Sequence, residues 1–195
     1  MTPTDQTSAE DIVVIVNAEN AIIEVAEGWT TAAKRQGADA QLAPEQVKGL
    51  DLADYIGSEV TCVYYEAALK LCRMKNTAIC REYRCDSPTH KRFMQVILTP
   101  KAEGCVEMRH RLLHESPFKQ RLDLRFADRE PKLKGFHLRC SLCNSIKLEN
   151  QSEWLAPESL LTDQPQKLAV IHGVCPNCEA THWRSFSLVK HSAHK

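Results

Sequence analysis

Four cysteines in two pairs carry the strongest chemical signal in the sequence. Cys140 and Cys143 are separated by two residues, and so are Cys175 and Cys178. Each Cys-x-x-Cys turn directs two thiolate sulfurs toward one point, and two such turns supply the four ligands of a tetrahedral zinc site. Four cysteines leave no ligand position for water, so we predict a structural Zn²⁺ rather than a catalytic one.

Other chemistries use the same cysteine spacing. A thiol oxidoreductase would need only one pair, Cys140 with Cys143 or Cys175 with Cys178, normally at the start of a helix in a βαβ unit. An iron–sulfur cluster and a set of merely buried thiols are further alternatives. Two matched pairs favour zinc, and His172 is then expected to hydrogen-bond a zinc-bound sulfur rather than to replace a ligand.

The composition is that of a globular protein with a sizeable core. The chain has 195 residues, of which 43% are hydrophobic, enough for one domain of ordinary size and a smaller unit. No apolar run approaches the roughly 20 residues that cross a bilayer, and the first eleven residues lack a signal-peptide core. An odd count of nine cysteines without an export signal favours a reducing compartment. We therefore expect a cytoplasmic protein with no membrane partner.

The formal net charge of zero hides an uneven distribution. Residues 1–60 carry eleven acids against three Lys and Arg, whereas residues 109–139 carry nine Lys and Arg against four acids. The basic stretch could contact phosphate, which makes nucleic acid a candidate partner, but Asp123, Asp128 and Glu130 interrupt it. A solvated connector is the favoured interpretation, and nucleic acid is not the favoured partner.

The order of the predicted elements indicates an α+β protein. An apolar pattern predicts a strand hairpin over 12–16 and 21–25, short helical segments over 29–35 and 49–57, and a longer helix over 58–75. Three strands are expected after it, over 78–85, 92–99 and 105–113. This order does not alternate as in a parallel α/β protein, so we expect an antiparallel sheet with helices on one face.

The segment from about Asp11 to Glu115 resembles a PAS sensory domain. The resemblance is carried by the hairpin around Asn17–Asn20, the turn Gly49-Leu50-Asp51-Leu52, the helix 58–75, and the strand sequences Tyr83–Pro88 and Arg92–Met94. It implies a five-stranded antiparallel sheet whose helices enclose an interior large enough for a small ligand.

The C-terminal part resembles a small cysteine module found in bacterial PAS and two-component signalling proteins. The residues that carry this resemblance are Cys140-Ser141-Leu142-Cys143, Trp154 and His172-Gly173-Val174-Cys175-Pro176-Asn177-Cys178. We expect a PAS-like domain at 10–116, a connector at 117–138, and a zinc-ribbon-like module at 139–190. Its small core would include Trp154, Leu160 and Leu161, with His182 and Trp183 extending it.

The PAS resemblance raises the question of a bound ligand, which the sequence does not identify. Haem, flavin and small metabolites are bound by such domains, but no flavin-type cysteine motif is present. Strand alternation places His110 on the same face as Val106 and Met108, so His110 is a candidate cofactor-binding residue, such as a haem ligand. A buried histidine without a ligand is the alternative. The five remaining cysteines are expected to be small apolar fillers, with oxidation of one exposed thiol left open: Cys62, Cys72, Cys80, Cys85 and Cys105.

The sequence predicts a regulatory protein rather than an enzyme. It contains no phosphate-binding loop, nucleophile elbow, His-Glu-x-x-His helix or kinase signature. We expect a sensor of a small ligand or of redox state that acts as a homodimer or on a signalling partner, with the zinc module as a structural or partner-binding platform. The alternatives are a nucleic-acid-binding transcriptional regulator and the Cys-x-x-Cys oxidoreductase.

Overall fold

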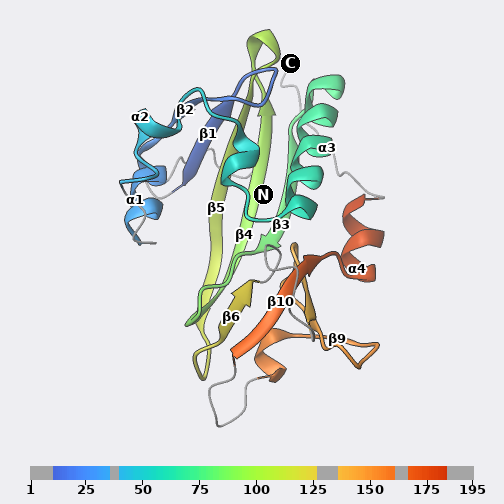
Figure 1. Ribbon diagram of the computed structural model, residues 1–195. Helices are drawn as coiled ribbons and strands as arrows, with labels where there is room; N and C mark the ends of the chain where they lie inside the picture. Colours follow the sequence, from blue (N-terminus) through green and yellow to red (C-terminus); the bar gives the residue numbers. More distant parts are fainter. Residues whose placement is uncertain (1–10, 36–39, 127–135, 161–166, 184–195) are drawn as a thin grey trace.

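The chain forms two five-stranded sheets (Figure 1). The computed structural model describes residues 11–35, 40–126, 136–160 and 167–183. The first sheet starts with the predicted hairpin, β1 (Ile12–Val16) and β2 (Ile22–Val25), which pair antiparallel. The Asn17 side chain accepts hydrogen bonds from the backbone N–H groups of Glu19 and Ala21, at 3.1 and 2.8 Å. These bonds close the turn, and the β-branched runs on both sides form the strands.

Three later strands complete the first sheet in the order β2-β1-β5-β4-β3, and neighbouring strands are all antiparallel. They are β3 (Ile79–Arg84), β4 (His90–Pro100) and β5 (Val106–Pro117), with the short helix η2 (Ala102–Gly104) between β4 and β5. The α+β class and the five-stranded antiparallel sheet are therefore confirmed. Strand β5 runs four residues beyond the predicted end at Leu113 because β4 continues to pair with it as far as Pro117.

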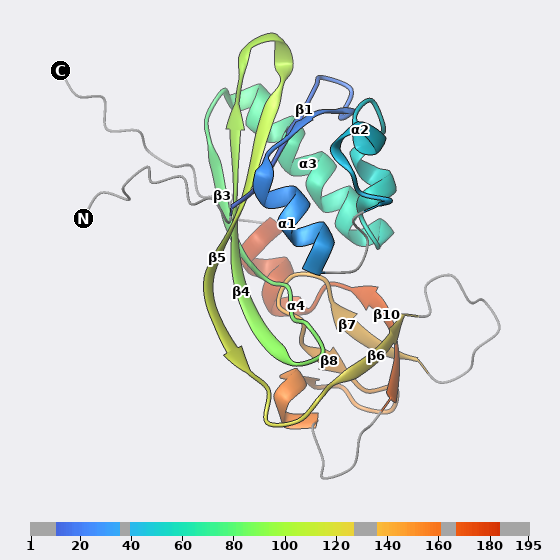
Figure 2. The same ribbon diagram turned by 90° about the vertical axis from the view of Figure 1, so that its left-hand side faces the viewer.

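The helices follow the hairpin and lie on one side of this sheet (Figure 2). They are α1 (Glu27–Arg35), α2 (Pro44–Val47), η1 (Leu52–Tyr55) and α3 (Glu59–Lys75). Ser58 caps α3 by accepting the Thr61 N–H, and Asn76 ends the helix in a left-handed conformation at φ 47°. The buried side of α3, including Leu69 and Cys72, packs against Ile79 and other core residues of the sheet. No helix in the described part of the chain is long and apolar enough to span a membrane.

The second sheet has the strand order β6-β10-β7-β8-β9. Its strands are β6 (Asp123–Phe126), β7 (His137–Cys140), β8 (Ile146–Lys147), β9 (Trp154–Leu155) and β10 (Lys167–Gly173), followed by α4 (Pro176–Cys178) and η4 (Glu179–Trp183), while η3 (Pro157–Leu160) follows β9. Strand β10 pairs parallel with both β6 and β7. The expected connector, 117–138, thus contributes β6 and the first residues of β7 to the sheet, and its Phe118 and Leu122 are buried.

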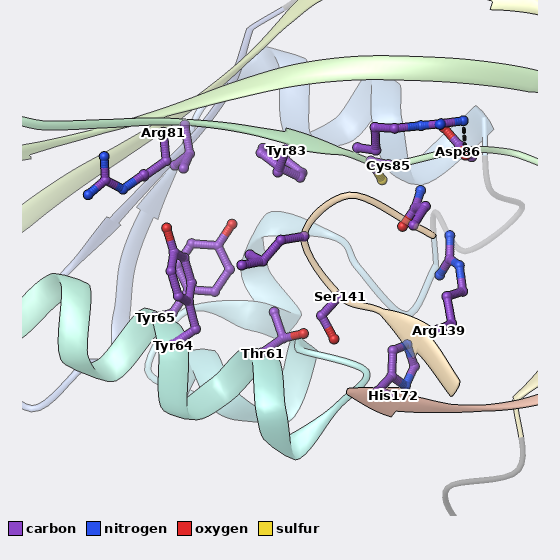
Figure 3. Close-up of a pocket in the computed structure, with 14 residues that line it drawn as sticks. Thr61, Tyr64, Tyr65, Arg81, Tyr83, Cys85, Asp86, Arg139, Ser141 and His172 are labelled. Atoms are coloured by element: carbon purple, nitrogen blue, oxygen red, sulfur yellow. Dashed lines mark hydrogen bonds and ion pairs between the residues drawn. The ribbon is translucent and has the colours of Figure 1, made fainter. Parts of the chain in front are cut away.

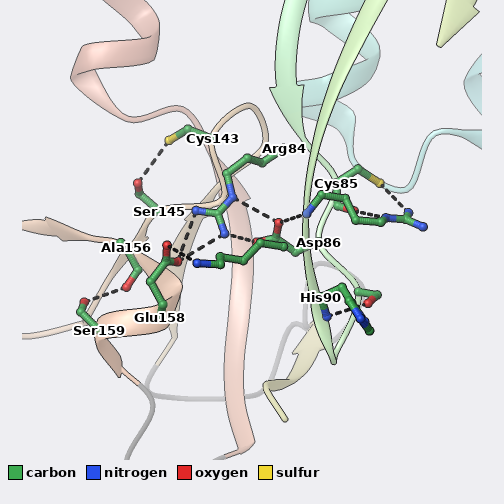
Figure 4. A network of polar contacts seen from close by, with 12 residues as sticks. Arg84, Cys85, Asp86, His90, Cys143, Ser145, Ala156, Glu158 and Ser159 are labelled. Atoms are coloured by element: carbon green, nitrogen blue, oxygen red, sulfur yellow. Dashed lines mark hydrogen bonds and ion pairs between the residues drawn. The ribbon is translucent and has the colours of Figure 1, made fainter. Parts of the chain in front are cut away.

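Backbone and side-chain contacts join the two sheets where β3 ends. The Arg84 N–H donates a 2.7 Å hydrogen bond to the carbonyl of Leu142, which lies in the first cysteine turn. The Arg84 guanidinium contacts Asp86 at 2.7 Å and Glu158 of η3 at 3.3 Å, and Lys91 reaches Glu158 at 3.8 Å (Figure 4). The first cysteine turn and η3 are therefore held directly against the first sheet.

Candidate functional site

The two cysteine turns meet because they follow two adjacent parallel strands. Cys140 is the last residue of β7, and in the pairing of β10 with β7 it lies opposite Gly173, the last residue of β10. Parallel strands end at the same edge of a sheet, so the turn after β7 and the turn after β10 lie side by side. The Ser141 N–H donates a 2.9 Å hydrogen bond to the Gly173 carbonyl, and Cys175 caps the start of α4.

The four sulfurs form a cluster of the size that a tetrahedral metal site requires. The Sγ atoms of Cys140, Cys143, Cys175 and Cys178 all lie within 4.8 Å of one another. The Sγ atoms of Cys143 and Cys175 are separated by 3.7 Å. Zinc–sulfur bonds of about 2.3 Å in a tetrahedron place sulfurs about 3.8 Å apart. The convergence of all four residues is confirmed: the cluster can hold a metal ion, and its donors suit Zn²⁺.

Backbone N–H groups support the sulfurs. The Cys175 N–H points to Cys140 Sγ and the Cys178 N–H to Cys175 Sγ, each at 3.4 Å. In the first turn Asn144 adopts φ 63°, a left-handed conformation that asparagine tolerates, and its N–H bonds to the Cys140 carbonyl at 3.0 Å. Such N–H···S contacts stabilise negative charge on sulfur, as metal-binding thiolates need.

The close approach of the sulfurs splits their acidities. Hydrogen bonds from Cys140 and Cys178 hold the pKa of Cys143 far below its usual range, while hydrogen bonding with Cys140 and Cys143 raises the pKa of Cys178. Burial raises the pKa of Cys175 to about 11. The sulfurs therefore affect one another's ionisation, and a bound cation would balance the charge of several thiolates.

The sequence also predicted roles for other residues of the C-terminal module, and the structure describes only some of them. Trp154 packs against the cysteine cluster, as expected for the small core. The His172 ring stacks on Phe126 of β6, with centroids 5.0 Å apart and planes 5° from parallel. Leu161 and the side chains of His182 and Trp183 lie outside the described residues.

A first cavity, here called the interior cavity, lies between the first sheet and its helices. Its volume is about 220 Å³, and the residues that line it come from β1, α1, η1 and the residue after it, α3, β3 and β5: Ile12, Val14, Trp29, Leu52, Tyr55, Ile56, Tyr65, Tyr83, Met108 and His110. Most of its surface is apolar or aromatic, which suits a small organic ligand.

His110 faces the interior cavity on the same strand face as Met108, as the alternation predicts. Its Nδ1 lies 2.8 Å from the Tyr83 hydroxyl, and its ring meets the Tyr65 ring edge-on at 6.2 Å. A cavity of about 220 Å³ lies below the roughly 300 to 1,000 Å³ of typical small-molecule pockets, so its size favours a small molecule over a haem macrocycle. His110 is partly buried, and it contacts the Tyr83 hydroxyl at the border of this cavity.

His110 is expected to make folding sensitive to acid. Burial lowers its pKa from 6.5 to about 4. Between these values the unfolded chain binds more protons than the folded one, so this stabilisation is complete above about pH 6.5 and is lost as the pH falls toward 4. We expect His110→Gln to remove about 2 kcal/mol of the stability difference between pH 7 and pH 5, measured by urea unfolding. The exposed His114, changed to Gln as a control, should leave the pH dependence intact.

A second cavity, here called the junction cavity, lies where the cysteine turn after β7 meets α3 and β3 (Figure 3). Its volume is about 230 Å³. Its walls come from both sheets and from α3: Thr61, Tyr64, Tyr65, Arg81, Tyr83, Arg84, Cys85, Asp86, Val96, Arg139, Ser141, Leu142, Asn144 and His172. No pattern in the sequence indicated this cavity, since its walls are far apart along the chain.

Several arginines of the basic stretch, residues 109–139, form ion pairs within the fold. Arg109 and Arg111 approach the buried Asp11 carboxylate at 3.6 and 3.4 Å, and Arg121 pairs with Asp123 at 2.7 Å. Lys132 and Lys134 lie outside the described residues. These ion pairs reduce the charge that the stretch could present to phosphate.

The fold and the site together define an α+β protein with a candidate four-cysteine metal centre. No family model matches the chain, and no curated protein matches it. Among solved structures, a domain of an HTR-like protein from Haloarcula marismortui is similar, with 20% sequence identity and a TM-score of 0.40 over 54% of this chain and 99% of that domain. A TM-score of this size does not define a shared fold.

Proposed function

We propose that this protein is a non-enzymatic sensory or regulatory protein in which a PAS-like domain binds a small ligand and a four-cysteine module holds structural Zn²⁺. The interior cavity is the ligand site, and Cys140, Cys143, Cys175 and Cys178 are the metal ligands. The module is a firm platform whose position responds to the occupancy of the cavity and is read by a partner or by a second copy of the chain.

The observation that carries this proposal is a shared wall. Tyr65 and Tyr83 line both the interior cavity and the junction cavity. The residue before Tyr65, Tyr64, packs in one cluster with Cys140, Cys175 and Cys178. A ligand that displaces the Tyr65 or Tyr83 ring in the interior cavity would therefore also displace side chains that contact the four-cysteine module.

The burial of the cysteines and the ion pairs of the arginines argue against a thiol oxidoreductase and a nucleic-acid-binding protein. A thiol oxidoreductase needs an accessible thiolate, whereas Cys140, Cys175 and Cys178 are 0 to 4% exposed and share one cluster with Cys143. A nucleic-acid-binding protein needs unpaired cations on one face, whereas Arg109, Arg111 and Arg121 have carboxylate partners.

A cavity-filling variant tests the coupling without knowledge of the ligand. Ile56 lines the interior cavity, so the indole of an Ile56→Trp variant would occupy part of it. We expect hydrogen exchange to change at the amides of α3 around Tyr64 and at those of the turn 141–145, measured by mass spectrometry. The control is Ile23→Trp, since Ile23 is 44% exposed and lines neither cavity. Exchange in the turn that is identical in all three proteins would refute the coupling.

Native mass spectrometry of protein purified without added metal tests the bound metal, the bound ligand and the number of subunits. We expect one zinc ion per chain, a retained small molecule in part of the sample, and the subunit number in the same spectrum. Zinc-free protein with a folded second sheet would contradict the structural metal.

A further inference from the structure

The junction cavity has more positive than negative charge. Three arginines line it, Arg81, Arg84 and Arg139, against one carboxylate, Asp86. Asp86 is already engaged: the Arg84 Nε and Nη2 donate to its two oxygens at 3.1 and 2.7 Å, and the Arg92 N–H donates to Oδ1 at 3.1 Å. The net charge of the side chains that line the cavity is therefore positive.

Arg139 contributes one of the positive charges of this cavity. Its guanidinium lies 5.4 Å above the Phe126 ring, and no carboxylate forms an ion pair with it in the described part of the chain. Its Nε is buried without a hydrogen-bond partner. The guanidinium is partly buried, and a cation withdrawn from water gains from an anion brought next to it.

Two further residues that line the same cavity have a buried polar atom without a hydrogen-bond partner. Asn144 is 2% exposed, and its Nδ2 has no hydrogen-bond partner. The Ser141 Oγ is likewise buried and without a partner. Buried polar groups are nearly always satisfied in folded proteins, so a set of unsatisfied donors around one cavity indicates a ligand that accepts their hydrogen bonds.

We infer that the junction cavity is a binding site for a small organic anion, a carboxylate carrying an aromatic or apolar group. Arg139, Asn144 and Ser141 would donate to the carboxylate, because a planar guanidinium matches its two oxygens. Tyr64, Leu142 and the other apolar walls would contact the body of the ligand. A volume of about 230 Å³ limits the ligand to a small molecule. This inference holds whether or not the interior cavity takes a ligand of its own.

The site can be tested with benzoate, which is anionic at pH 7, and with benzamide, which has nearly the same shape and no charge. Zinc-loaded, ¹⁵N-labelled full-length protein is titrated with each at constant ionic strength and followed by NMR. We expect benzoate to shift the amides of Ser141 and Asn144 and the Nε–H of Arg139, and benzamide to bind at least about 10-fold more weakly, since a charge-assisted hydrogen bond is lost.

Variants of Arg139 test whether its positive charge binds the carboxylate of benzoate. Arg139→Gln is expected to weaken benzoate binding by about 10- to 100-fold and to leave the zinc content unchanged. Arg139→Lys keeps the charge and should weaken binding less, which also provides a second variant if the first folds poorly. Arg121→Gln is the matched control, because Arg121 is 63% exposed, pairs with Asp123 and lies outside the cavity.

Four results would overturn the inference. Three of them are the absence of benzoate-induced shifts at Ser141, Asn144 and Arg139, equal affinity for benzamide, and unchanged benzoate binding in both Arg139 variants. Shifts confined to the Trp29 indole and other residues of the interior cavity would place the ligand there and also refute the junction site, while leaving the proposed sensory role in place.

Discussion

Replacement of Cys175 by serine is expected to abolish metal binding and to unfold the second sheet. Structural Zn²⁺ contributes roughly 10 to 16 kcal/mol to the folding of zinc-finger peptides. Strands β8 and β9 have only two residues each, and the cluster is the meeting point of both cysteine turns. Such short strands bury too little apolar surface to fold without the metal. Elemental analysis would show loss of zinc, and hydrogen exchange would show loss of protection in β7 to β10.

Chelation of the wild-type protein should reproduce the result of the Cys175→Ser variant, and the first sheet should stay folded, because its core cluster contains none of the four cysteines. The control is Cys105→Ser, which changes a cysteine outside the cluster and should keep one zinc per chain. A Cys175→Ser protein that retains zinc or keeps a protected second sheet would contradict a structural metal centre.

Truncation of Leu69 to alanine is the second large effect that we expect. Leu69 lies on α3, is 1% exposed and belongs to the main core cluster. Removal of a buried leucine side chain leaves a cavity and costs about 3 to 5 kcal/mol in well-packed cores. Urea unfolding followed by the fluorescence of Trp29 would measure the loss.

Met74 provides the control on the same helix. It is 72% exposed, so Met74→Ala should change the free energy of unfolding by no more than about 0.5 kcal/mol. Equal effects of Leu69→Ala and Met74→Ala would mean that α3 does not pack on the sheet as described. The packing of α3 also matters for the proposed function, because its Tyr65 lines the interior cavity and its Tyr64 packs against the cysteine cluster.

Local patterns in the sequence predicted most of the first sheet and its helices. The hairpin, α3 and the last three strands depend on spacings of two and of three to four residues, which neighbouring side chains enforce directly. The same local logic placed His110 and Met108 on one face of β5. The ends of β4 and β5 were less predictable, because pairing with each other extends them beyond their own apolar patterns.

The cysteine spacing predicted the four candidate metal ligands but not how they come together. Two residues between cysteines define each pair, and four sulfur donors indicate a tetrahedral metal, whatever fold surrounds them. The parallel pairing of β10 with β7 brings the pairs together, and β6 comes from the stretch 117–138 that polar composition marked as a connector. Strand pairing across such distances depends on partners that no local pattern specifies.

The sequence by itself determined the antiparallel sheet, its helical cover and the four sulfur ligands, because each is encoded by residues close together along the chain. Only the tertiary structure placed Arg139 and Asn144 in one cavity with Tyr64 and Arg81. These residues come from separate strands, a helix and a turn, and the position of the first cysteine turn beside β3 and α3 brings their side chains together. A binding site made in this way has no sequence motif, since burial and unsatisfied hydrogen bonds exist only in the folded chain.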